Sequence, residues 1–168
     1  MNLEEKIRSF PDFPKKGILF RDISPVLHDP EALKEAIRLM GRGLERPEAV
    51  VAIESRGFVF GTGLALHWNV PLVPARKFGK LPGPTVRQVY SLEYGEDSLE
   101  IQAGSLGVGT RVAIVDDLLA TGGTAKATAG LVEKLDARVT ALVFLVELRG
   151  LGGREALAGW PVHSVLQL

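Results

Sequence analysis

Two adjacent carboxylates stand directly before a turn of small and hydroxyl-bearing residues in this chain. Asp116 and Asp117 close an apolar run that begins at residue 112, and the letters ATGGT follow at residues 120–124. Glycine has no side chain and adopts dihedral angles that other residues avoid, so the main-chain N–H groups of such a turn can converge on an anion. Threonine hydroxyl groups add further donors. We therefore expect a phosphate group to be bound by Ala120, Thr121, Gly122, Gly123 and Thr124.

The two carboxylates need a different partner, because they would repel a phosphate. A carboxylate only accepts hydrogen bonds, which suits the two neighbouring hydroxyl groups of a ribose. A helix predicted over residues 124–135 would add the positive end of its dipole to the phosphate cradle. The whole run therefore predicts a site for a phosphorylated sugar. The alternative is an ordinary turn and helix N-cap after a strand whose end is solvated by Asp116 and Asp117.

Strands and helices must position these residues, and the chain alternates between the two patterns. The apolar runs predict strands over residues 49–53, 70–75, 99–102, 111–115, 139–148 and 162–166. Helical spacing predicts helices over residues 30–44, 58–68 and 124–135, the first of them capped by Asp29. Such alternation indicates a mostly parallel sheet covered by helices on both faces. Ligands of these sheets bind beyond the carboxyl ends of the strands, where Asp116 and Asp117 stand.

Residues 76–94 lose the apolar period of the flanking segments. They contain Gly79, Pro82, Gly83 and Pro84, which interrupt regular structure. We expect a long excursion here rather than a packed element, and loops of this length inside compact domains are often functional lids.

The composition is typical of a globular domain. The chain has 168 residues, of which 46% are apolar and 24% are charged, and this length suits one domain with a sizeable core. Lys and Arg together number 20, as do Asp and Glu. A net charge of zero provides no overall attraction to nucleic acid or to an anionic membrane, so we expect neither as a partner.

Cysteine is absent from the chain, which excludes disulfides, thiolate metal sites and a cysteine nucleophile. The charged first ten residues lack the apolar core of a signal peptide, and the longest apolar runs are too short to cross a bilayer. These features predict a cytoplasmic protein. The sequence has no Walker A motif, no complete GxGxxG run and no GxSxG elbow, so kinase-like, dinucleotide-binding and hydrolase functions are unsupported.

The run VDDLLATGGT at residues 115–124 resembles the phosphoribosyl pyrophosphate motif of the type I phosphoribosyltransferases, and in particular that of the adenine-specific branch of this family. Further matches occur in the same order along almost the whole chain. They are FRDISP at residues 20–25, ESRGF at 54–58, RKFGKLP at 76–82, SLEYG at 91–95 and VEL at 146–148. The chain departs from the family at Glu54, where Asp is common, and at Phe78, where a basic residue or proline is frequent.

The resemblance implies an α/β, Rossmann-like fold: a mostly parallel twisted sheet flanked by helices, in a single domain over residues 1–168. It implies a small base-binding hood at residues 1–30 and a flexible lid at residues 76–97. The implied reaction transfers the 5-phosphoribosyl group from phosphoribosyl pyrophosphate to adenine, giving AMP and pyrophosphate with Mg²⁺. It also implies a homodimer. Because the three histidines are scattered, we expect Mg²⁺ to arrive with the substrate phosphates and not in a cage of protein ligands.

The resemblance also assigns roles to individual residues. Asp116 and Asp117 would contact the ribose, and a pyrophosphate group would be bound by Ser55, Arg56, Arg76, Lys77 and Lys80. Such basic groups suit a leaving group on which negative charge grows. Glu93 and Tyr94 would be the catalytic residues of the lid: Glu93 would handle a proton on the purine, and Tyr94 would orient the leaving group or the lid.

Four residues would recognise the base by the same resemblance. Phe20 and Leu148 would sandwich the purine ring, the backbone of Leu19 would accept a hydrogen bond from the exocyclic amine, and Arg21 would contact the base edge. A carbonyl at that position would meet another acceptor in a 6-oxopurine, and the site would reject it. For Phe20 and Leu148 the alternative is a plain core position.

Two other functions are weighed against this one. A type I phosphoribosyltransferase for an oxopurine or orotate is disfavoured by FRD at residues 20–22 and SLEY at residues 91–94. A regulator that keeps the sugar phosphate pocket and binds nucleic acid would need an added DNA-binding domain or a basic face. The chain has no room for such a domain and no net positive charge.

Overall fold

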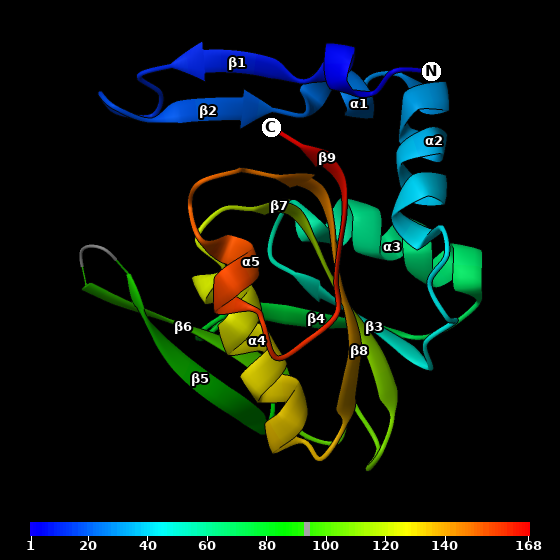
Figure 1. The fold of residues 1–168 in the computed structure, drawn as a ribbon. Helices are drawn as coiled ribbons and strands as arrows, with labels where there is room; N and C mark the ends of the chain where they lie inside the picture. Colours follow the sequence, from blue (N-terminus) through cyan, green and yellow to red (C-terminus); the bar gives the residue numbers. More distant parts are fainter. Residues whose placement is uncertain (93–94) are drawn as a thin grey trace. The chain divides into compact units, whose positions relative to one another are not determined.

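The computed structural model describes residues 1–92 and 95–168 (Figure 1). It divides into two compact units, Met1–Arg42 and Gly43–Leu168. The first unit contains a short helix η1 (Glu4–Lys6), strands β1 (Arg8–Pro11) and β2 (Leu19–Asp22), and helices α1 (Ser24–Leu27) and α2 (Pro30–Gly41). Strands β1 and β2 form an antiparallel hairpin.

Helix α2 begins as the sequence predicts. Asp29 stands at its N-cap, and its carboxylate accepts hydrogen bonds from the N–H groups of Glu31 and Ala32 at 3.0 and 3.3 Å. These bonds satisfy donors that have no partner inside the helix, and Pro30 at the first helical position has no N–H group to satisfy.

The second unit is built on a sheet with seven strands in its described part, in the order β5-β6-β4-β3-β7-β8-β9. The bounds are β3 (Ala49–Ile53), β4 (Leu72–Lys77), β5 (Thr85–Leu92), β6 (Gly95–Gln102), β7 (Arg111–Leu119), β8 (Arg138–Glu147) and β9 (Val162–Gln167). Strands β4, β3, β7, β8 and β9 are mutually parallel. Strand β6 runs antiparallel to β4, and β5 antiparallel to β6. The prediction of a mostly parallel sheet is confirmed.

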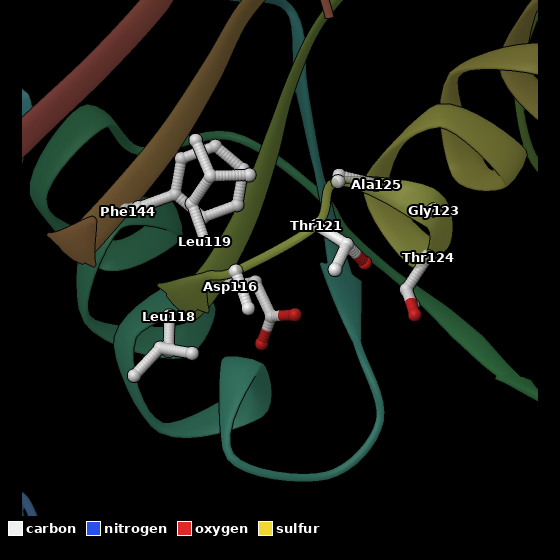
Figure 2. A pocket seen from close by; sticks show the side chains of 10 residues that line it. Asp116, Leu118, Leu119, Thr121, Gly123, Thr124, Ala125 and Phe144 are labelled. Atoms are coloured by element: carbon white, nitrogen blue, oxygen red, sulfur yellow. The ribbon is translucent and has the colours of Figure 1, made fainter. Parts of the chain in front are cut away.

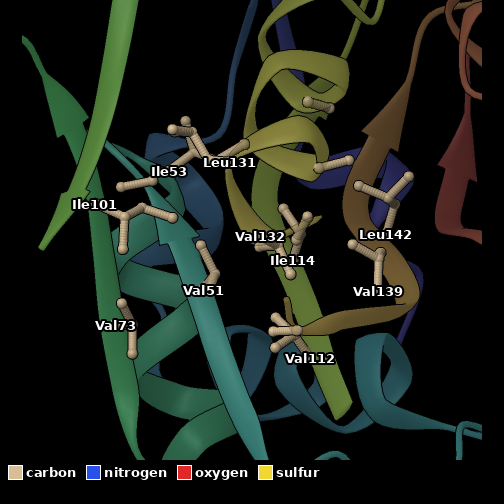
Figure 3. Close-up of a cluster of buried hydrophobic side chains, with 14 of the residues drawn as sticks. Val51, Ile53, Val73, Ile101, Val112, Ile114, Leu131, Val132, Val139 and Leu142 are labelled. Atoms are coloured by element: carbon tan, nitrogen blue, oxygen red, sulfur yellow. The ribbon is translucent and has the colours of Figure 1, made fainter. Parts of the chain in front are cut away.

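Helices cover both faces of this sheet. The helices are α3 (Gly57–Trp68), α4 (Gly123–Lys134) and α5 (Gly153–Ala156). Ala52 of β3 faces Gly61 of α3, whereas its neighbour Val51 packs in a buried cluster that includes Leu131 and Val132 of α4 (Figure 3). Because successive side chains of a strand point to opposite faces, α3 and α4 lie on opposite sides of the sheet. Burial on both faces explains why β3 reads as an uninterrupted apolar run.

The prediction of a long excursion rather than a packed element over residues 76–94 is wrong for residues 76–77, which end β4, and for residues 85–92. Residues 85–92 form β5, which pairs with β6 from Thr85 opposite Gln102 to Leu92 opposite Gly95. Val86 and Tyr90, four residues apart, pack against the core cluster. The inward-facing positions of β5 alternate with exposed ones, but the inward position between Val86 and Tyr90 is the polar Gln88. The sequence therefore shows no clear apolar alternation here, and the Gly and Pro residues at 79–84 led to the prediction of an excursion. No helix in the described part of the chain is both long and apolar enough to span a membrane.

Candidate active site

The phosphate cradle predicted from the sequence forms a hollow at the carboxyl end of β7. The hollow has a volume of about 100 Å³. Its lining comprises Asp116, Leu118, Leu119, Ala120, Thr121, Gly122, Gly123, Thr124, Ala125 and Phe144. Figure 2 shows Asp116 directed into the space between the end of β7 and the start of α4, with Thr121 and Thr124 on the other side of that space. The structure thus brings the whole predicted run together around one opening.

Main-chain donors of the cradle lack partners within the described protein. In the described part of the chain, the N–H groups of Thr121 and Gly122 have no hydrogen-bond acceptor. The first N–H groups of α4 lack partners inside the helix for the general reason that holds at every helix start. Gly122 has a φ of +85°, and a Cβ atom there would lie 2.9 Å from the carbonyl oxygen of Gly153. Only glycine fits this turn without strain.

A second, larger hollow adjoins the cradle. Its volume is about 290 Å³, and its lining comprises Ile53, Glu54, Ser55, Arg56, Lys77, Tyr90, Leu99, Asp116, Asp117 and Thr124. Asp116 and Thr124 therefore belong to both linings. The loop after β3 contributes Ser55 and Arg56, and the Glu54–Ser55 peptide is cis. The structure thus places the predicted pyrophosphate loop beside the two carboxylates, although these segments are about sixty residues apart in sequence.

Gly57 allows this close approach, and the sequence reading did not single it out. It is the first residue of α3. A Cβ atom at this position would lie 2.9 Å from both Asp116 Oδ1 and the carbonyl oxygen of Val115. A glycine that directly follows a predicted binding loop and opens a helix is the signal that could have identified it. Tyr90 of the larger hollow was also missed, because it lies on β5 within the misread segment 76–94. Leu99 was predicted to lie on a strand but not to line a site.

The basic side chains of this region have carboxylate partners within the protein. Arg56 Nε lies 2.9 Å from Asp117 Oδ2, and Arg76 Nη2 donates to Glu54 Oε1 at 2.9 Å. Lys77 forms an ion pair with Asp97. Its main-chain N–H donates to Glu54 Oε2 at 2.7 Å. The cationic side chains Arg56, Arg76 and Lys77 are therefore each fixed by an acidic side chain that also balances their charge.

Arg76 and Lys80 are not in the lining of either hollow in the described chain. Arg76 is connected to the pyrophosphate loop through Glu54, and its Nη1 donates to the carbonyl oxygen of Lys80 at 3.3 Å. Direct contact of these two residues with a pyrophosphate group stays a prediction.

The pKa values of the carboxyl groups in the site are shifted in opposite directions: those of Asp116 and Asp117 are raised, and that of Glu54 is lowered. Burial raises the pKa of Asp116 well above its ordinary value, and the neighbouring charge of Asp117 raises it further. Asp117 is only 3% exposed; burial raises its pKa, and the nearby Arg56 guanidinium offsets part of that rise. For Glu54, burial also acts to raise the pKa, but hydrogen bonds from Arg76 and from the N–H of Lys77 outweigh it and lower the value overall.

The residues predicted to recognise the base lie in different units. Leu19, Phe20 and Arg21 form most of β2 in the first unit. There Phe20 contributes to an apolar hollow of about 250 Å³ with Phe10, Phe13 and Asp22, and its ring packs edge to face on Phe13 with centroids 5.1 Å apart. Leu148 follows β8 in the second unit, where its N–H donates to the carbonyl oxygen of Leu119. The sandwich of a base between Phe20 and Leu148 stays a prediction. The predicted catalytic residues, Glu93 and Tyr94, lie outside the described residues.

Comparison with known proteins connects this site to one family. The family model of the phosphoribosyl transferase domain matches residues 23–160. The chain is 54% identical to an adenine phosphoribosyltransferase of Synechococcus sp. (strain CC9605), with 99% of each chain covered. It is 51% identical to that of Francisella tularensis subsp. novicida (strain U112), again over 99% of each.

Solved structures agree with these relatives. The crystal structure of adenine phosphoribosyltransferase from Rhodothermus marinus DSM 4252 is 49% identical, with a TM-score of 0.93 over 99% of this chain and 96% of that one. The enzyme from Saccharomyces cerevisiae, solved in complex with adenine and an imino-altritol bisphosphate, is 40% identical. Its TM-score is 0.88 over 97% of this chain and 96% of that one.

The raised pKa of Asp116 predicts the effect of replacing it with Asn. A carboxyl group whose pKa is raised by folding costs stability as the pH climbs above its ordinary value of 3.8. The neutral amide avoids this cost, and its oxygen can still accept the Asp117 N–H bond that Asp116 Oδ1 now accepts. We expect Asp116→Asn to increase the free energy of unfolding at pH 7 by on the order of 1 kcal/mol, measured by urea denaturation from pH 4 to 8.

Asp22→Asn is the matched control, with the opposite sign. Hydrogen bonds from Ser24, assisted by Arg8, lower the pKa of Asp22 to about 2. Its stabilising effect is therefore present above pH 3.8 and is lost as the pH falls toward 2, so this variant should lose stability at pH 7. A loss of stability in both variants at pH 7 would contradict the account of Asp116.

Proposed function

Since the chain belongs to the phosphoribosyl transferase family and, within it, to the adenine phosphoribosyltransferases, we propose that its two adjoining hollows hold phosphoribosyl pyrophosphate. The chain is a pentosyltransferase of purine salvage. It transfers the 5-phosphoribosyl group to adenine and gives AMP and pyrophosphate. The substrate carries a phosphate at one end of the ribose and a pyrophosphate at the other. It therefore requires two anion sites with hydroxyl acceptors between them.

The observation that carries this proposal is the shared rim of the two hollows. The cradle at residues 120–124 offers open main-chain donors for the 5′-phosphate. The larger hollow offers the Ser55 hydroxyl and the Arg56 and Lys77 cations for the pyrophosphate. Asp116 lines both hollows, and its neighbour Asp117 lines the second, so the carboxylates stand where the ribose hydroxyl groups would donate. Such hydrogen bonds favour the charged carboxylates and offset their burial.

The chemical step breaks the bond between the anomeric carbon and the pyrophosphate oxygen and forms a bond from that carbon to the purine nitrogen. Negative charge grows on the departing pyrophosphate, so donors fixed before the reaction lower the barrier. Arg56 is fixed by Asp117, and Lys77 by Asp97. These ion pairs position the cations, and an incoming pyrophosphate would replace part of the carboxylate contacts.

Mg²⁺ fits this site as an ion that the substrate brings with it. In the described part of the chain, no three His, Cys, Asp or Glu side chains lie together in a group that could hold a metal. The hollow nevertheless has carboxylate oxygens at its rim, and Mg²⁺ binds through one or two carboxylates together with phosphate oxygens and water. Asp116 and Asp117 would face such an ion, which would neutralise charge on the pyrophosphate.

Base recognition is proposed for Leu19, Phe20, Arg21 and Leu148, in the roles that the family resemblance implies. Phe20 supports this assignment, because it offers an aromatic face beside an apolar hollow. Arg21 donates to Ser9 Oγ at 2.5 Å, which holds its guanidinium against the neighbouring strand. A main-chain carbonyl that accepts from the 6-amino group of adenine would oppose a 6-oxo group.

Closure of the lid is proposed to exclude water, which would otherwise trap the oxocarbenium-like centre. Glu93 would handle the proton of the purine imidazole edge, and Tyr94 would orient the leaving group or the lid. Strand β5 ends at Leu92, directly before Glu93 and Tyr94 in the sequence. Its residue Tyr90 lines the larger hollow, and this supports the proposal that the lid acts at this site.

A homodimer is proposed on the outer side of α3. Apart from Thr62 and His67, this helix consists of apolar residues and glycine, a composition typical of a buried helix. Val59 is nevertheless 40% exposed and Leu66 78% exposed. A second copy of the chain would cover these side chains.

A cytoplasmic location is proposed from the absence of cysteine, which suits a reducing compartment, and cell fractionation would test it.

The base specificity is the direct test of the proposed function. We expect turnover of adenine with phosphoribosyl pyrophosphate and Mg²⁺, and a kcat/KM for hypoxanthine, guanine or orotate lower by at least about 100-fold. A spectrophotometric or radiolabel assay with the four bases measures this. Equal rates with hypoxanthine would contradict adenine specificity, and salt-dependent binding of DNA or RNA without turnover of adenine would favour the regulator instead.

Substitutions in the lid test the roles of its two catalytic candidates. Glu93→Gln and Tyr94→Phe are expected to lower kcat more than they raise KM, because the groups act in the transition state and not in ground-state binding. Glu31→Gln removes the same charge from an exposed position of α2, outside the lid, and should leave kcat unchanged. Wild-type kcat values in both lid variants would reject these roles.

The dimer proposal predicts the effect of a charge on α3. Leu66→Glu should shift the protein from dimer to monomer in sedimentation velocity, because a buried unpaired carboxylate opposes association. Glu31→Gln on the exposed side of α2 serves as a control. A wild-type chain that sediments as a monomer at high concentration would refute the proposal.

A further inference from the structure

A buried glutamate lies close to the site but lines neither hollow. Glu100 of β6 is only 2% exposed. It is the register partner of Arg76 on β4, and directly opposed side chains of antiparallel strands leave the same face of the sheet. Its carboxylate is nevertheless directed to a turn of the main chain. A buried carboxylate needs such partners, because its desolvation is costly when its oxygens are not satisfied.

Glu100 fills a nest of main-chain donors in the turn after β4. Its Oε1 accepts hydrogen bonds from the N–H groups of Gly79, Lys80 and Leu81 at 3.1, 3.2 and 3.0 Å. Its Oε2 accepts from Thr85 Oγ1 at 3.1 Å. Consecutive N–H groups in such a turn form an anion-binding concavity. Here the anion is supplied by the protein itself, so the turn is closed to a substrate phosphate.

The opposite side of this turn is also held. The guanidinium of Arg87 lies over the ring of Phe78, 4.0 Å from its centroid, and the N–H of Phe78 donates to the carbonyl oxygen of Ser98 at 3.2 Å. The aromatic residue at position 78, at which this chain departs from its family pattern, therefore anchors the turn to β5 and β6. The N–H of Lys80 also donates to the carbonyl oxygen of Lys77 at 3.3 Å, whereas in the described part of the chain the N–H groups of Gly79 and Leu81 donate to Glu100 alone.

The turn at residues 79–81, once fixed by Glu100, also positions Arg76. The carbonyl oxygen of Lys80 accepts from Arg76 Nη1 at 3.3 Å, while Arg76 Nη2 donates to Glu54 Oε1 at 2.9 Å. Glu54 also accepts from the N–H of Lys77 at 2.7 Å, and it opens the loop that contains Ser55 and Arg56. A continuous chain of hydrogen bonds therefore runs from Glu100 through the turn and Arg76 to this loop.

We propose that Glu100 is a positioning residue for the pyrophosphate side of the site. By filling the nest at residues 79–81, it fixes the Lys80 carbonyl, and through it the guanidinium of Arg76 and the loop after Glu54. This inference rests on the proposed function in assigning that loop to pyrophosphate. It separates the roles of two acids of the same sheet: Asp116 of β7 would face the substrate, whereas Glu100 of β6 acts only through other groups.

The test compares binding of pyrophosphate with binding of adenine. Glu100→Ala leaves the N–H groups of Gly79 and Leu81 without an acceptor, whereas the N–H of Lys80 keeps the carbonyl oxygen of Lys77 at 3.3 Å. We expect the Kd for inorganic pyrophosphate with Mg²⁺ and the KM for phosphoribosyl pyrophosphate to rise about tenfold. Glu100→Gln keeps an oxygen acceptor but loses the charge, so a smaller rise of about threefold is expected. The KM for adenine should stay within about twofold of wild type in both variants. Calorimetry measures the Kd, and steady-state kinetics measures both KM values.

Glu45→Gln is the matched control, because it removes the same charge from a side chain that is 82% exposed and paired with Arg111 at the start of β7. It should bind pyrophosphate as wild type does. Urea denaturation establishes which variants are folded; if Glu100→Ala does not fold, Glu100→Gln decides the question.

A folded Glu100 variant with the wild-type Kd for pyrophosphate would overturn the inference, as would equal rises in the two KM values. A merely structural role would lower the free energy of unfolding without separating the two substrates. Wild-type protein that binds pyrophosphate but does not turn over adenine would refute the proposed function, while the Kd values would still decide the role of Glu100.

Discussion

Two neighbouring carboxyl groups at the end of a buried strand lose hydration when the chain folds, and the arrangement of the site follows from that cost. Asp117 is almost completely buried, and exclusion of water raises the pKa of both groups. Arg56 offsets part of the cost through its ion pair with Asp117. Main-chain N–H groups offset a further part, and a ligand that donates hydrogen bonds, as the ribose of the proposed substrate would, would relieve more of it. Function and stability therefore oppose each other at these two residues.

The cations in and next to the larger hollow are also paired with acids of the protein. Each has a carboxylate partner on a neighbouring element: Asp117 for Arg56, Glu54 for Arg76 and Asp97 for Lys77. Side chains that are already ordered lose less conformational entropy when a ligand binds. Charge balance also explains how a chain without net charge can bind a multiply charged substrate, because the attraction is local and directed.

Local patterns predicted much of the fold and part of the site. Strand β3 is buried on both faces, and its run of five apolar residues matches the observed bounds. The cradle at residues 120–124 is contiguous, so its residue types were sufficient to identify it. Strand β5 was missed, because its pairing with β6 depends on a partner strand and not on its own composition. Gly57 and Glu100 were missed for a related reason: their importance comes from Asp116 and from residues 79–81, which approach them only in the folded chain.

The sequence by itself determined the type of chemistry, because the proposed phosphate cradle and its adjacent acids are encoded in one short segment whose backbone geometry is local. It also determined the family, through motifs in a consistent order along the chain. Tertiary structure decided which charges meet. Parallel pairing of β3 with β7 brings the loop after Ile53 beside Asp116, and the antiparallel pairing of β6 with β4 brings Glu100 beneath the turn that holds Arg76. The partners in these contacts are separated by about twenty to sixty residues, and only the sheet register sets their distances.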